Sequence, residues 1–154
     1  MLPLSFSVSL LLLLSSLSLQ ALALQGRSLQ VVQQRRRLLE DRLMEAAQQF
    51  AGALQRQHRC LLPLSDAQWA QAACAEPGAL EALRQGVAGE QGWQLLHYRP
   101  QAGAGGEGQA ELLLQPSGGG PAAAFALRFS ADKSLRLLAV QELGLRSATA
   151  EVAR

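Results

Sequence analysis

Hydrophobic and polar residues follow three successive patterns along this chain. Leu2 to Leu24 contains no charged residue and consists mainly of Leu, Ser and Ala. From Leu29 to Arg59, apolar residues recur at intervals of three, four and seven, which is the period of an amphipathic helix. Beyond Gly92 the period changes to two, as in strands with one buried face. The patterns predict an α+β fold in which a long N-terminal helix, hydrophobic and then amphipathic, precedes a β-sheet.

The amphipathic helix is expected to pack through a single apolar face. A stripe of this kind usually covers a sheet or another helix. A self-standing coiled coil is the alternative, but the repeat is short for one. We therefore expect the helix to pack on the sheet through Val32, Leu39, Leu43, Phe50 and Leu54.

Four segments of the C-terminal half have the period and composition of strands. Each segment is joined to the next by a short connection, which predicts a four-stranded antiparallel meander. The Gly/Ala-rich stretch 101–109 is expected to be a mobile loop, and Gly86, Gly89 and Gly92 are expected to mark another loop. The predicted strands are Trp93–Tyr98, Ala110–Gln115, Ala122–Ser130 and Leu135–Glu142.

These patterns divide the chain into five segments. Each boundary lies where the hydrophobic period changes or where Pro and Gly interrupt it. The segments are a transmembrane anchor or signal at 1–28, an amphipathic helix at 29–59, a short helical linker with two cysteines at 60–91, an antiparallel sheet at 92–146 and a flexible tail at 147–154.

The uncharged N-terminal segment has two interpretations. Ala21-Leu22-Ala23 fits the small-x-small pattern of signal peptidase sites, although no Lys or Arg precedes the apolar run. The run is also long enough for a membrane-spanning helix, which needs about 20 apolar residues. We favour the retained helix, which predicts a single-pass inner-membrane protein with a periplasmic or extracellular C-terminal domain. The alternative is a secreted protein cleaved after Ala23.

The charge and the cysteine content limit the kinds of partner and of metal site that this chain could have. The net charge of +2 is too small to indicate nucleic acid, but Arg35, Arg36 and Arg37 form a basic cluster that could contact anionic lipid headgroups. Cys60 and Cys74 are expected to form a disulfide if the chain is exported. Their spacing does not fit a metal site.

The order of segments resembles the type IV pilin and pseudopilin family. The resemblance rests on Leu4–Leu24 running directly into the amphipathic Gln30–Gln57, on the sheet that starts at Trp93, and on the Cys60/Cys74 pair beside it. It implies a structural subunit that assembles with other pilus-type subunits through its N-terminal helix. The chain lacks the basic leader ending in Gly, the aromatic first residue and the early Glu of that family, so no functional residue is transferred.

Residues able to carry out catalysis are sparse. His58 and His97 belong to no metal-binding spacing, and no Gly-x-Ser-x-Gly motif occurs. We expect no catalytic residue, cofactor or metal, and no nucleic-acid partner. The predicted function is a membrane-anchored, pilin-like structural or assembly subunit of a bacterial surface or secretion system. The alternative is a soluble secreted or periplasmic binding module released after Ala23.

Overall fold

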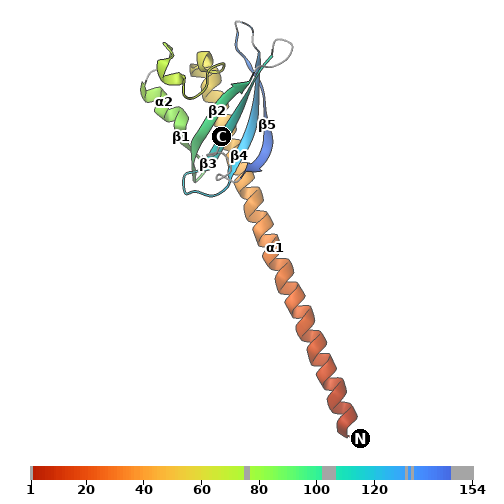
Figure 1. Ribbon diagram of the computed structural model, residues 1–154. Coiled ribbons are helices and arrows are strands. Elements are labelled where there is room, and N and C mark those ends of the chain that lie inside the picture. Colours follow the sequence, from red (N-terminus) through yellow and green to blue (C-terminus); the bar gives the residue numbers. More distant parts are fainter. Residues whose placement is uncertain (1, 75–76, 102–106, 131, 133, 147–154) are drawn as a thin grey trace. The chain divides into compact units, whose positions relative to one another are not determined.

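The computed structural model describes residues 2–74, 77–101, 107–130, 132 and 134–146 (Figure 1). The chain divides into two units, Met1–Leu38 and Leu39–Arg154, which are described separately. Its elements are α1 (Leu2–Gln57), the 3-10 turns η1 (Arg59–Leu61) and η2 (Trp69–Gln71), α2 (Pro77–Arg84), β1 (Gln85–Ala88), β2 (Gln91–Gln101), β3 (Glu107–Pro116), β4 (Ala122–Ser130) and β5 (Leu137–Arg146).

All described residues of the first unit belong to α1. In the described part of the chain, no helix combines the length and the apolar composition that crossing a membrane requires. The prediction of a transmembrane anchor in a single-pass inner-membrane protein is therefore wrong.

The second unit contains one antiparallel sheet with the strand order β1-β2-β3-β4-β5. Each strand pairs with the next in sequence, so the sheet is a meander, and the predicted α+β class is confirmed (Figure 1). The predicted number of four strands is wrong, because the sheet has five. Residues 102–106 of the predicted loop and the predicted tail 147–154 lie outside the described residues.

The strand missed by the sequence pattern is β1, where glycines had indicated a loop. Gly86 pairs with Trp93 of β2, and a Cβ atom at Gly86 would lie 2.6 Å from the Trp93 indole. The glycine therefore makes room for a large side chain on the neighbouring strand. Gly89, with φ of 60°, begins the two-residue connection between Ala88 and Gln91. Both glycines are therefore part of the β1–β2 hairpin.

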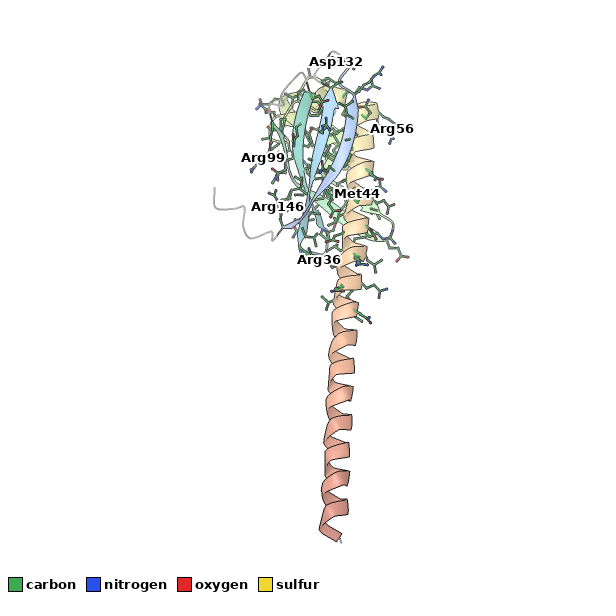
Figure 2. All side chains as sticks on the ribbon, turned by 90° about the vertical axis from the view of Figure 1, so that its right-hand side faces the viewer. Arg36, Met44, Arg56, Arg99, Asp132 and Arg146 are labelled. Carbon is green, nitrogen blue, oxygen red and sulfur yellow. A yellow bond between two sulfur atoms is a disulfide. The ribbon has the colours of Figure 1, made fainter. Side chains whose placement is uncertain are left out.

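The core lies between the second half of α1 and one face of the sheet. Leu43, Phe50 and Leu54 of the predicted stripe are fully buried and share one cluster with Phe125 and Leu127 of β4. Figure 2 shows Met44 on the part of α1 that runs beside the strands. The remaining helix residues of this cluster are mostly alanines, whose small side chains let helix and sheet approach closely: Ala46, Ala47 and Ala51.

The two N-terminal members of the predicted stripe lie in different surroundings. Leu39 is partly buried and packs against the core, whereas the side chain of Val32 is 64% exposed. The buried stripe thus begins near Leu39, at the boundary between the two units.

The linker after α1 carries the predicted disulfide, which is present between Cys60 and Cys74. Closing a loop of this length contributes about 3 kcal/mol in the chain-entropy model. Leu61, Leu62 and Trp69 within or beside η1 and η2 are fully buried in the main core. The disulfide therefore fastens a segment that is itself part of the hydrophobic core.

We predict that Leu43→Ala lowers the free energy of unfolding by about 2–5 kcal/mol, because it removes a fully buried leucine and leaves a cavity. Val32→Ala on the same helix is the matched control and should change it by less than about 0.5 kcal/mol. Urea unfolding of the full chain, followed by circular dichroism, measures both. Equal effects at the two positions would contradict the packing of α1 on the sheet.

Candidate interaction surface

Neither His58 nor His97 belongs to a possible metal site in the part of the chain that the structure describes. His58 follows α1 and donates its backbone N–H to Leu54 O at 3.0 Å. His97 lies in β2 opposite Leu113 of β3, and its side chain is buried. Within the described residues, no three His, Cys, Asp or Glu side chains come together as a possible metal site.

Four aromatic rings form the centre of the core beside the disulfide. Phe50 of α1 lies 6.2 Å from Trp69, 6.4 Å from Trp93 and 6.0 Å from Tyr98, measured between ring centroids. The Tyr98 hydroxyl donates a hydrogen bond of 2.7 Å to Leu62 O. Burial raises the pKa of Tyr98 above its ordinary value, because the phenolate would lose its hydration. This cluster is closed to ligands and holds the linker on the sheet.

The edge of β2 beyond β1 is closed by a single residue of the linker. The backbone N–H of Asp66 donates to Tyr98 O at 3.1 Å, and the Tyr98 N–H donates to Asp66 Oδ1 at 3.3 Å. Asp66 thus satisfies both main-chain groups of one strand residue, as a neighbouring strand would. Together with β1, it protects this side of the sheet from pairing with another chain.

The opposite edge of the sheet is formed by β5. Among the described residues, β5 has a neighbouring strand, β4, on one side only (Figure 1). Its pairing with β4 is irregular between Ala124 and Phe125 and between Arg128 and Phe129, so Leu143 and Leu138 have no partner on β4. These unpaired residues are 48% and 52% exposed. Each bulge therefore turns a leucine toward solvent at the sheet's free edge.

The turn before β5 is fixed by an exposed carboxylate. Asp132 Oδ1 accepts hydrogen bonds from the Ser134 N–H at 3.0 Å and from the Ser130 hydroxyl at 2.9 Å. The bonds from Ser134 and Ser130 lower the pKa of Asp132, because they stabilise its charged form. At the helix side, Gln55 Oε1 accepts the N–H of Leu137 at 2.7 Å. The start of β5 is thereby held on both sides.

The face of the sheet turned away from α1 carries a small cluster of buried apolar residues. Leu113, Ala122 and Ala124 are buried there and form a cluster separate from the main core. Figure 2 views the sheet from the side of β5 and labels Arg99 and Arg146. Arg146 forms an ion pair of 2.9 Å with Glu111 of β3. This face combines small apolar residues with paired charges.

Residues 30–38 of α1 are all exposed. Val31 and Leu38, which are 49% and 55% exposed, lie two helical turns apart on one line of the helix. Val32 lies about 100° around the helix from Val31, and Arg35 falls between them. A shallow hollow on another side of the helix is lined by Gln30, Gln33, Gln34 and Arg37.

No family model, no curated protein and no solved structure matches this chain. The sequence pattern predicts Val32 in the stripe but does not single out Val31, Leu38 or the exposed leucines of β5. Valine and leucine two turns apart are visible in the sequence, whereas a bulge depends on how two distant strands pair.

We predict that the protein's single tyrosine ionises only when the fold is lost. The raised pKa of Tyr98 means that the folded chain keeps its proton at a pH where the unfolded chain, with a pKa of about 10, releases it. The free energy of unfolding should therefore fall as the pH rises above about 10. A pH titration of phenolate absorbance, with circular dichroism in parallel, tests this. Ionisation at the ordinary pKa in a folded chain would contradict the burial of Tyr98.

Proposed function

We propose that this chain is an exported, non-catalytic assembly subunit of pilin-like architecture that associates with other subunits through α1. The observation that carries the proposal is that apolar residues of α1 are exposed in one part of the helix and buried in another. Leu43, Phe50 and Leu54 are buried against the chain's own sheet, while Val31 and Val32 on the preceding turns are exposed. The exposed residues are available to a second helix.

The spacing of the apolar residues supports helix-to-helix docking. Val31 precedes Leu38 by seven residues, and Val32 precedes Leu39 by seven, so each pair lies on one line along the helix, with Arg35 between the two lines. The opposite side is occupied by Gln33 and its polar neighbours. A partner helix that packs along these two lines, here called the helix seam, would remove the exposed valines from water, which contributes about 25 cal/mol for each Å² of apolar surface.

Export is supported by the Cys60–Cys74 disulfide, which is typical of oxidising compartments outside the cytosol. In an exported subunit, Arg35, Arg36 and Arg37 would place three positive charges within one turn of α1, suited to anionic lipid headgroups at the cell surface.

A second candidate is a soluble secreted or periplasmic binding module released after Ala23. The observation in its favour is that the disulfide and the core both lie within the unit Leu39–Arg154. In that case the sheet, and not the N-terminal helix, would bind the partner.

Site-specific photo-cross-linking in the producing cell tests the proposal. A benzophenone side chain introduced in place of Val32 should form adducts with neighbouring subunits, because position 32 lies on the helix seam. The same group in place of Gln33, which is also exposed but lies on the polar side, is the matched control. Adducts at position 32 at least about tenfold above those at position 33 are expected for a docking seam, since a tenfold preference corresponds to about 1.4 kcal/mol.

The result that would contradict the assembly subunit is an equal yield at both positions, or no adduct at either. Intact mass of the recovered chain separates the second candidate. A protein that begins at Leu24 and gives no helix adducts would be the secreted module. A chain that retains the segment before Leu24 and cross-links through position 32 would support the assembly subunit.

A further inference from the structure

We infer that β5 is a homotypic docking edge, to which β5 of a second copy adds in antiparallel orientation with the two-fold axis close to Ala139. This inference concerns a surface on the sheet and does not depend on the helix seam. It rests on the different treatment of the two edges of the sheet and on the distribution of charge along β5.

The two edges of the sheet are treated differently. On one side the edge strand is β1, which has only 4 residues, and beyond it Asp66 bonds both main-chain groups of Tyr98 in β2. On the β5 edge, Gln55 accepts the N–H of Leu137, and β4 is the sole neighbouring strand among the described residues. β5 has no Pro or Lys, although the bulge at Leu138 and the bond from Leu137 to Gln55 limit the main-chain groups that a second strand could pair with.

The charge pattern of β5 indicates a second copy as the occupant. Leu137–Gln141 carries no charge, and it is preceded by Arg136 and followed by Glu142. When two such segments pair antiparallel about Ala139, Arg136 of each copy lies opposite Glu142 of the other. Both side chains are exposed, and neither forms an ion pair with another described residue. Residues 136–142 are thus complementary in charge to the same residues of a second, antiparallel copy.

Other symmetric registers are less favourable. An axis at Glu142 would set two carboxylates against each other, and an axis at Gln141 would set Arg136 opposite Arg146. Directly opposed like charges destabilise a strand pair. The exposed Leu138, one residue from the axis at Ala139, would be partly covered by the added strand. An axis at Gly144 would oppose Glu142 to Arg146, but Arg146 already forms an ion pair with Glu111. The axis at Ala139 instead opposes Arg136 to Glu142, and the leucine contributes apolar contact.

The contact is expected to be weak in isolation. Pairing of about five residues from each copy buries far less than the roughly 1,200 Å² of a stable interface. It would become effective where copies are held close together, because tethering raises their effective concentration.

Disulfide trapping in the full chain tests this inference. Cys60 and Cys74 are joined to each other, so an introduced cysteine is the single free thiol. Ala139→Cys places two thiols on opposed residues at the axis, where Cα atoms about 4.5–5.5 Å apart allow a disulfide. Leu143→Cys, on the same strand but four residues from the axis, is the control. We expect covalent dimers to form at least about tenfold faster with Ala139→Cys at matched concentrations, a difference of about 1.4 kcal/mol.

A charge exchange separates strand pairing from chance collision. In the Ala139→Cys background, Arg136→Glu should slow dimer formation, since glutamates would then oppose each other in both halves of the pair. Glu142→Arg should slow it in the same way, and the two changes together should restore it. Failure of the double variant to recover, equal trapping at positions 139 and 143, or no trapping at either would overturn the inference. Circular dichroism of each variant checks that the fold is intact.

Discussion

The packing of one helical stripe on one sheet face is the interaction on which this structure depends. An antiparallel sheet with an apolar face needs a cover, and an amphipathic helix needs an apolar surface to bury its stripe. Phe50 lies at the centre of this contact, within 6.4 Å of the rings of Trp69, Trp93 and Tyr98. The helix, the disulfide-closed linker and the sheet therefore meet around a single side chain.

The same contact determines which surfaces remain available. α1 buries its stripe from Leu39 onward, whereas Val31, Val32 and Leu38 are exposed. The linker that packs beside Phe50 also carries Asp66, which closes the β2 edge. What remains is the helix seam at residues 31–39 and the edge of the sheet formed by β5. An assembly subunit needs at least one such surface, and two would allow contacts in different directions.

The sequence predicted the features that depend on local period. The stripe from Leu39 to Leu54 repeats every three or four residues, and Ala122–Ser130 has the composition of a strand, with β4 at those same bounds. The disulfide followed from two cysteines and a segment that suggested export. Each of these signals is contained in neighbouring residues or in a simple count.

The errors arose where structure depends on residues far apart in the chain. Gly86 looks like a loop glycine until the indole of Trp93 is placed on the adjacent strand. Leu138 and Leu143 are exposed because β5 pairs irregularly with β4, which no local pattern reveals. The membrane anchor was predicted from the length, the Leu-rich composition and the lack of charge of Leu2–Leu24, but no helix in the described part of the chain meets the requirements of a membrane span.

Hydrogen exchange tests the central packing interaction most directly. If the second half of α1 and the sheet form one cooperative unit, the slowest amides of Ala46–Leu54 and those of β3 and β4 should exchange with the same free energy of opening. Native-state exchange of the full chain, measured by NMR as a function of denaturant, compares these values. A helix that opens at a distinctly lower free energy than the sheet would contradict the account.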